Sequence, residues 1–185
     1  MSAYGQDLTF YRVDTTASKL LWKCDKHNGL FKLEKGGVVV ENKAVVDGLF
    51  FININSLKDL DMNVKQFGTA VLIFENTLKN EFLEAKKYPN AFFRIEEIKS
   101  LEKDKYTIIG DLTMHGITNC ISFDADIIFK GNKIYFKSEK FTIDRTDWGV
   151  YRMSPKRPYP DDENNWTVPD NVDITIDMVL VKDVE

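Results

Sequence analysis

The sequence contains very little cysteine and histidine, which limits both disulfides and metal sites. Among 185 residues there are two cysteines, Cys24 and Cys120, and two histidines, His27 and His115. Two cysteines so far apart do not imply a disulfide framework, and we expect both to be reduced thiols in the core or the sheet. Cys24 and His27 form the best local metal motif. Residues three apart on one strand point to opposite faces, however, so no metal site is predicted.

Long apolar runs and clustered positive charge are also absent. No stretch reaches the length of a membrane span, and the first residues, MSAYGQDLTFYRVD, have neither the positive nor the apolar region of a secretory signal. We therefore expect no integral membrane segment and a cytoplasmic location, or a periplasmic one if a leader has been removed. The net charge of −4 argues against a nucleic-acid partner, because such a partner needs a clustered basic face.

The motifs of several common enzyme classes are missing as well. The sequence has no Gly-x-Ser-x-Gly elbow, no phosphate-binding loop and no His-Glu-x-x-His helix. Asp124 and Asp126 are a close pair of carboxylates, but their place in an alternating segment puts them on the wet face of a strand. The sequence therefore predicts no catalytic residue, no metal and no cofactor.

Alternation of apolar and polar residues dominates what is present. It is clearest from Ile117 to Phe129 and from Val172 to Leu180, where one face of each segment is apolar. Similar segments, mostly separated by turn residues, are 19–26, 29–41, 43–54, 90–98, 105–115 and 132–143. About eight short strands joined by turns predict a mainly β fold, an antiparallel β-barrel. The length and the 43% hydrophobic content predict one domain over 1–185.

Two segments break this pattern. Phe74, Leu78, Phe82 and Ala85 recur at helical spacing, with Glu75 among the polar residues between them, and predict an amphipathic helix over about 68–88 that lies on the barrel. We expect it to stop before Pro89. Residues 150–170 lose the alternation and contain four of the five prolines, which predicts a long surface loop.

Four segments in the same order resemble the YceI-like family of lipocalin-like, polyisoprenoid-binding bacterial proteins. They are SKLLWKCDKHNGLFKLEKGGVVVENKAVVDGLFFININSL, FLEAKKYPNAFFRI, YTIIGDLTMHGITNCISFDADI and FTIDRTDWGV, which together cover most of the chain. The resemblance implies a lipocalin-like antiparallel barrel with a helical insertion and an apolar interior that takes a long lipid.

The interior of such a barrel is either filled by its own side chains or open to one ligand. The residues alone favour a filled core, and the resemblance favours a ligand site. The residues expected to line the site are Trp22, Phe50, Ile52, Phe93, Leu112, Met114, Phe123 and Phe136. A one-residue register slip would exchange the inward and outward members of each strand.

His115 and Arg145 are the polar candidates for contact with a ligand. His115 follows Met114 close to a turn, where its imidazole either fixes the hairpin or bonds a ligand head group at the barrel mouth. Arg145 and Asp147 share a face if their segment is extended. Arg145 then pairs with an acidic side chain that pins the corner, with Trp148 closing one end of the barrel, or it meets a pyrophosphate head of the kind family ligands imply.

Three functions follow from these observations. The first is non-enzymatic binding, transport or storage of a long apolar lipid, such as an isoprenoid, polyprenyl species or quinone. The second is an enzyme for a small lipophilic substrate, with His115 as acid or base and a carboxylate in reach. The third is a structural or stress-associated interaction module with a filled core and an exposed apolar patch. A homodimer is compatible with all three.

Overall fold

The computed structural model describes residues 8–62, 64–157 and 167–183, and its main feature is one sheet of ten strands. In chain order these are β1 (Leu8–Val13), β2 (Lys19–Cys24), β3 (His27–Glu41), β4 (Ala44–Asp59), β5 (Asn90–Glu102), β6 (Lys105–Met114), β7 (Ile117–Lys130), β8 (Lys133–Ser138), β9 (Phe141–Asp144) and β10 (Asn171–Lys182). The predicted antiparallel β fold is confirmed.

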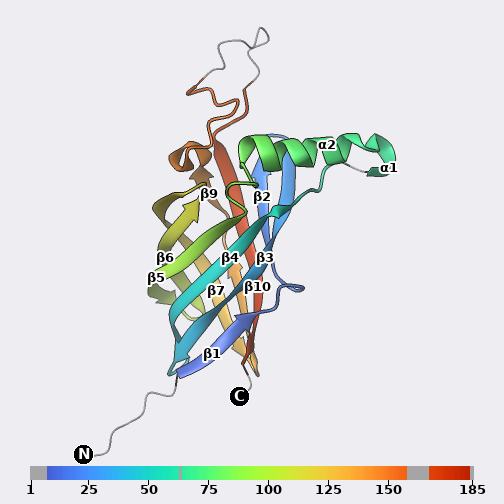
Figure 1. The fold of residues 1–185 in the computed structure, drawn as a ribbon. Coiled ribbons are helices and arrows are strands. Elements are labelled where there is room, and N and C mark those ends of the chain that lie inside the picture. The colour runs from blue at the N-terminus through green and yellow to red at the C-terminus, as the bar shows by residue number, and fades with distance from the viewer. Residues whose placement is uncertain (1–7, 63, 158–166, 184–185) are drawn as a thin grey trace, which may run out of the picture.

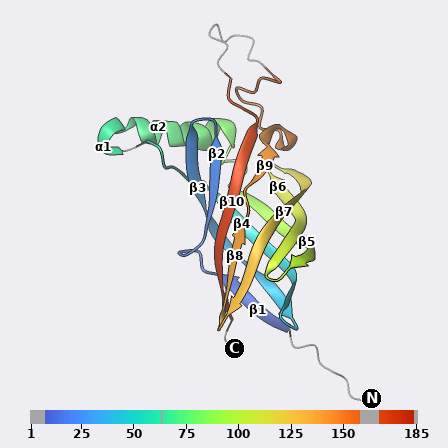
Figure 2. The same ribbon diagram turned by 180° about the vertical axis from the view of Figure 1, so that it is seen from behind.

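Eight of the strands form a closed ring. The order is β10-β2-β3-β4-β5-β6-β7-β8, and β8 pairs with β10 to complete it, with antiparallel pairing throughout. β1 pairs with β10 and with β3, as β2 also does (Figures 1 and 2). β1 and β2 therefore follow one another in the same gap between β10 and β3, with β1 at the lower end of the ring. β1 is the one strand that the sequence patterns missed.

The alternation of β7 and β10 places their side chains as predicted. Phe123, Ala125 and Ile127 of β7 are buried, and so are Ile174, Met178 and Leu180 of β10. Asp124 stays on the other face of β7, where Thr107 donates a hydrogen bond to it at 2.6 Å. The register is therefore the one that the apolar residues specify.

The predicted strand over 132–143 is split into β8 and β9. Between the pairs Lys137–Asp177 and Phe141–Ile174, the β8–β9 side has one residue more than β10, which is a bulge. The backbone N–H of Ile176 donates instead to the buried Ser138 Oγ at 2.8 Å. The extra residue bends the chain, and β9 continues beside the start of β10.

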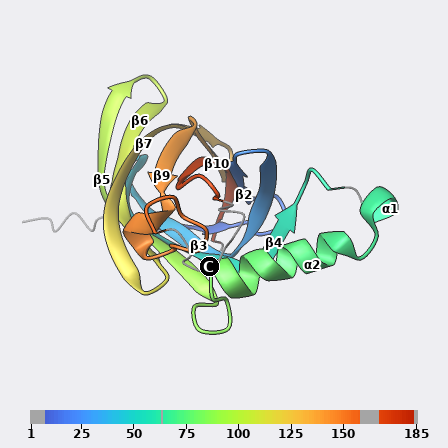
Figure 3. The ribbon, with the colours of Figure 1, turned by 90° about the horizontal axis from the view of Figure 1, so that it is seen from above.

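The helical insertion differs from its prediction in extent. It consists of α1 (Val64–Phe67), α2 (Ala70–Thr77) and a π-helical turn, η1 (Leu78–Phe82), so it begins about four residues and ends about six residues earlier than predicted. Glu84 has a φ of +44°, so the helix ends well before Pro89. Figures 1 and 3 show the helices at the upper end of the ring, with α1 and most of α2 extending outward rather than across it. No helix in the described ranges is long and apolar enough to span a membrane.

The predicted polarity of this helix is wrong at Glu75. Phe74, Leu78 and Phe82 are half-buried as expected, but Glu75 is only 3% exposed. Its carboxylate accepts a hydrogen bond from the Asp59 backbone N–H at 3.1 Å and pairs with Lys58 at 3.1 Å and Lys79 at 3.7 Å. These partners satisfy the buried charge, so the helix attaches to the end of β4 through an acidic residue.

The interior is filled by side chains at the lower end of the ring, away from the helices. Ile108, Ile134 and Leu180 are at most 1% exposed there, and the rings of Tyr11 and Phe129 meet edge to face with centroids 6.3 Å apart. These five residues pack into the main core cluster. The lower end of the ring is therefore closed by its own side chains.

Candidate functional site: an apolar cavity inside the ring

An apolar cavity lies inside the ring above this filled end. The volume in which a water molecule would fit is about 90 Å³, and the atom-free space inside the walls and in the open solvent at the mouth is about 860 Å³. Its walls are formed by Leu20, Phe31, Leu33, Phe50, Ile52, Ile54, Ala91, Phe93, Ile95, Leu112, Met114, Ile121, Phe123, Phe136, Phe141, Ile143, Ile174, Ile176 and Met178. Every one of these residues is apolar.

Seven of the ten residues predicted to contact a ligand line this cavity. They are Phe50, Ile52, Phe93, Leu112, Met114, Phe123 and Phe136. The antiparallel register explains the grouping, because Phe50 of β4 pairs with Phe93 of β5, and Phe93 pairs with Leu112 of β6. Alternation puts one face of each strand inside, so cross-strand partners meet on that face.

Phe123 is the centre of an aromatic cluster in the wall. Its ring stacks on Phe141 with centroids 4.4 Å apart, and it lies 5.6 Å from Phe93 and 6.4 Å from Phe136. Phe141 is not among the predicted ligand contacts, because the sequence pattern predicts one continuous strand over 132–143. The signal that could have found it is the polar Ser138–Lys140 interruption, after which the inward face of the chain changes.

Trp22 lies outside the cavity wall. Its indole is 8% exposed and packs with Leu57 and Ile174 in a second, smaller core cluster, with Leu78 and Leu83 from the helical segment beside it. The predicted role of Trp22 as a ligand contact stays a prediction. Its position indicates that it packs the upper end of the ring under the helical insertion.

His115 also lies outside the cavity lining. It occupies the two-residue turn between β6 and β7 with a φ of +54°, followed by Gly116 at +78°. Its imidazole packs on Tyr88 with centroids 4.5 Å apart, and Nε2 lies 3.3 Å from Glu84 Oε1. The carboxylate that the enzyme hypothesis requires is therefore present, but the pair does not face the cavity. The geometry supports the alternative in which His115 fixes the hairpin to the segment after η1.

Arg145 is buried among backbone carbonyls of the loop that follows β9. Its guanidinium donates to the carbonyl oxygens of Val150 at 2.6 Å, Arg152 at 2.9 Å, Val168 at 3.0 Å and Pro169 at 3.1 Å. Nη2 also lies 3.2 Å from Asp170 Oδ1. Burial lowers the pKa of Arg145, and the charge of Asp170 opposes this shift. These contacts match the predicted role of pinning the corner. A contact between Arg145 and a ligand head group stays a prediction.

The segment of Arg145 and Asp147 is not extended, so the condition under which the two residues would share a face is not met. Residues Arg145–Trp148 form a 3₁₀ turn, η2, because Asp144 caps it by accepting hydrogen bonds from Thr146 N at 2.9 Å and Thr146 Oγ1 at 2.6 Å. Burial opposes ionisation of Asp144, but hydrogen bonds from Lys156 and Thr146 lower its pKa to about 2. Trp148 is buried and donates from Nε1 to Leu112 O at 2.8 Å, outside the cavity lining.

The residues between 150 and 170 fit the predicted loop only in part. Residues 150–157 and 167–170 contain no helix or strand, and they wrap around the Arg145 guanidinium. Residues 158–166, which include Pro158 and Pro160, lie outside the described part of the chain. The loop prediction is therefore tested only at its two ends.

The two cysteines are free thiols. Cys24 and His27 do not lie on one strand, as the sequence analysis assumed, because Cys24 ends β2 and His27 begins β3. The two residues flank the turn between β2 and β3 and are cross-strand partners. Cys24 Sγ lies 3.5 Å from Pro169 O, and burial raises the pKa of the thiol. Cys24 is therefore a weak metal ligand near neutral pH.

The chemistry available to the cavity follows from its lining. No titratable side chain in the described residues borders it, so it offers contact area and no proton donor, nucleophile or charge. Apolar surface binds by removal from water, at roughly 25 cal/mol per Å². Such a site discriminates ligands by shape and length.

The model of the YceI-like domain matches residues 11–180 of the chain. Curated relatives match over shorter segments. A UPF0312 protein of Pectobacterium atrosepticum is 40% identical over 72 residues, which is 39% of this chain and 30% of that protein. UPF0312 proteins of Pseudomonas putida are 44% identical over 45 residues, or 24% of this chain and 23% of theirs. The chain thus matches less than a third of the length of these relatives.

Solved structures share the fold over nearly the whole chain. BcnA of Burkholderia cenocepacia superposes with a TM-score of 0.70 at 20% identity, covering 90% of this chain and 98% of that one. A polyisoprenoid binding domain from Saccharophagus degradans gives a TM-score of 0.61 at 11% identity, covering 97% and 100%. The Campylobacter jejuni YCEI protein gives 0.55 at 18% identity, covering 89% and 85%. The overall fold is therefore similar in all three.

Proposed function

This chain belongs to the YceI-like family, and from that membership and the apolar cavity we propose that it binds one long apolar lipid, an isoprenoid or quinone, without chemical change. The binding allows transport or storage of a molecule that water excludes. The observation that carries the proposal is the composition of the cavity wall. Every described residue that lines the cavity is apolar, and none of these lining residues is titratable.

The shape of the interior supports a chain-like ligand that enters from the helical end. Ile108, Ile134 and Leu180 fill the lower end, so a ligand inserted from there would have to displace the most buried side chains in the ring. Ile54, Met114 and Ile143 border the cavity near the opposite ends of their strands. The tail then points toward the filled end, and the polar head stays near the turns and η2.

The ligand class is supported by the similar structure from Saccharophagus degradans, which is described as a polyisoprenoid binding domain. The aromatic cluster around Phe123 agrees with this class, because flat rings can pack along a branched hydrocarbon and need no hydrogen-bond partner. The flexible Met114 and Met178 side chains in the wall can adjust to the methyl branches of an isoprenoid.

Native mass spectrometry of freshly purified protein tests this proposal. We expect one long-chain lipid per chain, identified after extraction with organic solvent, and we expect delipidated protein to take up an added isoprenoid quinone. A mass equal to that of the bare chain, together with no uptake of added quinone or polyprenyl lipid, would contradict the proposal and favour a filled interior.

A further inference from the structure

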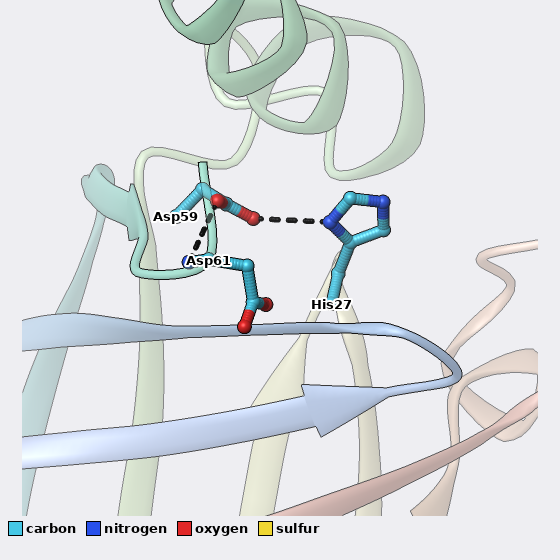
Figure 4. Close-up of side chains that lie close together, drawn as sticks. All are labelled: His27, Asp59 and Asp61. Carbon is cyan, nitrogen blue, oxygen red and sulfur yellow. Dashed lines mark hydrogen bonds and ion pairs between the residues drawn. The ribbon is translucent and has the colours of Figure 1, made fainter. Parts of the chain in front are cut away.

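His27, Asp59 and Asp61 converge on the outer side of the upper end of the ring. One ligand atom from each residue lies within 4.8 Å of the other two, and His27 Nδ1 is 3.3 Å from Asp59 Oδ2. Figure 4 shows Asp59 pointing its carboxylate at the imidazole, while the carboxylate of the neighbouring Asp61 is directed toward the start of β3, where Asn28 donates to it. From this cluster we propose a binding site for one divalent transition-metal ion, with these three side chains as ligands. The site is separate from the cavity and does not depend on the proposed lipid function.

Two atoms of the cluster are buried and without a hydrogen bond. The Asp59 side chain is 0% exposed, yet within the described residues neither its Oδ2 nor His27 Nδ1 has a hydrogen-bond partner. The 3.3 Å contact between them is therefore not aligned as a hydrogen bond. A buried carboxylate oxygen without a partner is costly, and a bound cation removes that cost for both atoms.

The nearby lysines do not supply the missing charge to Asp59. Lys58 and Lys79 both pair with Glu75 Oε2, at 3.1 Å and 3.7 Å. Glu75 accepts a hydrogen bond from the backbone N–H of Asp59. Of the two buried acids at this corner, Glu75 is thus neutralised by lysines, whereas within the described residues Asp59 Oδ2 pairs with the His27 imidazole.

The surroundings hold each ligand in position. Asp59 Oδ1 accepts hydrogen bonds from the backbone N–H groups of Asp61 at 3.0 Å and Met62 at 2.6 Å, which fixes the direction of Oδ2. Asn28 donates from its backbone and its side-chain amide to the two oxygens of Asp61. The Phe74 ring packs on His27 with centroids 4.5 Å apart. Such supporting contacts orient the ligands of metal sites.

The ligand set and its spacing indicate the kind of ion. Ligands about 2.0–2.1 Å from a tetrahedral Zn²⁺ are roughly 3.3–3.4 Å apart, which agrees with the His27–Asp59 distance. Calcium prefers six to eight oxygen ligands, whereas an imidazole and two carboxylates suit Zn²⁺ and its neighbours. Water would complete the coordination, because Asp61 is exposed.

An ion at this position would connect three segments. His27 begins β3, Asp59 ends β4, and Asp61 lies in the connection to α1, while Phe74 of α2 covers the imidazole. The ion therefore ties the β2–β3 turn to the base of the helical insertion. Its binding would stabilise that corner, because an ion held only by the folded chain adds its binding free energy to folding.

Isothermal titration calorimetry of tag-free protein with Zn²⁺ and with Ca²⁺ tests the proposal. We expect one Zn²⁺ per chain with a rise in the thermal midpoint, and no comparable effect of Ca²⁺. His27→Gln and Asp61→Ala should each weaken Zn²⁺ binding by at least about tenfold. Asp59→Asn should do the same, and its amide oxygen can still accept the two backbone hydrogen bonds.

His115→Gln is the matched control. His115 also lies 3.3 Å from a carboxylate, that of Glu84, but no third ligand completes that pair within the described residues. This variant should bind Zn²⁺ as the original chain does. Absence of Zn²⁺ binding, or binding that survives both His27→Gln and Asp61→Ala, would overturn the proposal. The second result would place any bound Zn²⁺ elsewhere on the surface.

Discussion

Trp22 lies across Gly29 on the neighbouring strand, and the missing side chain of the glycine is what makes room for the indole. The two residues are cross-strand partners in the β2–β3 pair. A Cβ placed on Gly29 would lie 2.5 Å from the indole Cζ2 and 2.1 Å from Lys58 O. The small and the large residue together fill the upper end of the ring below the helices.

Gly29→Ala should therefore lower the free energy of unfolding by about 1–3 kcal/mol, the usual range for overpacking. Urea denaturation followed by Trp fluorescence measures the change. Gly131→Asn is a suitable control, because no atom lies within 4 Å of a Cβ there and asparagine tolerates the φ of +62°. Equal stability of the original chain and Gly29→Ala would contradict this prediction, because it would require both the Trp22 indole and the Lys58 carbonyl to move aside without cost.

We predict that Arg145 stabilises the fold through its buried contacts and that its replacement lowers the free energy of unfolding. In Arg145→Met, Asp170 and the loop carbonyls lose their buried partner, so we expect a loss of about 3–5 kcal/mol in the free energy of unfolding. Arg94→Met removes an exposed arginine paired with Glu96 and should cost at most about 1 kcal/mol. Chemical denaturation compares the two variants, and similar small losses would contradict the structural role.

The Asp144 corner predicts a dependence of stability on pH. Its pKa is lowered from 3.8 to about 2 in the folded chain, so the unfolded chain binds the proton more readily. The stabilisation is complete above about pH 4 and is lost as the pH falls toward 2. The difference in unfolding free energy between the original chain and Asp144→Asn should therefore shrink between pH 5 and pH 2. A difference that stays constant over this range would contradict the assignment.

His115→Asn tests whether the histidine contacts the ligand. The turn has positive φ at both residues, and Asn-Gly is the preferred pair for such a turn. Because His115 does not line the cavity, we expect lipid affinity to stay within about twofold of the original value, measured by fluorescence titration with a quinone. A loss of tenfold or more would place His115 at the ligand head group.

Much of the fold could be predicted because the alternation of apolar and polar residues shows which face of each strand points into the ring. Ile174, Met178 and Leu180 face inward because a one-residue slip would expose all of them. β1 was missed because its six residues lack a clear alternation and share one ring position with β2. The split of β8 and β9 was missed because a bulge depends on Ser138 replacing a backbone partner.

The site was predictable only where it is made of strand faces. The positions of Phe50, Phe93 and Leu112 in the cavity wall follow from the register of their strands. The positions of Trp22, His115 and Arg145 depend instead on where strands and turns end, which alternation does not predict. A cap at Asp144 turned Arg145 away from an extended face. The cluster of His27 with Asp59 and Asp61 could not be predicted, because 32 residues separate His27 from the end of β4 and only the tertiary fold brings them together.

The most direct test of the central claim is ligand uptake by a chain whose cavity is filled. Ala91 is 3% exposed and lines the cavity, so Ala91→Trp should occupy part of it, whereas Ala44→Trp places the same ring at an exposed position. Native mass spectrometry of delipidated protein with an isoprenoid quinone should show one ligand on the original chain and on Ala44→Trp, and at least about tenfold less on Ala91→Trp. Equal uptake by a folded Ala91→Trp would contradict binding inside the ring.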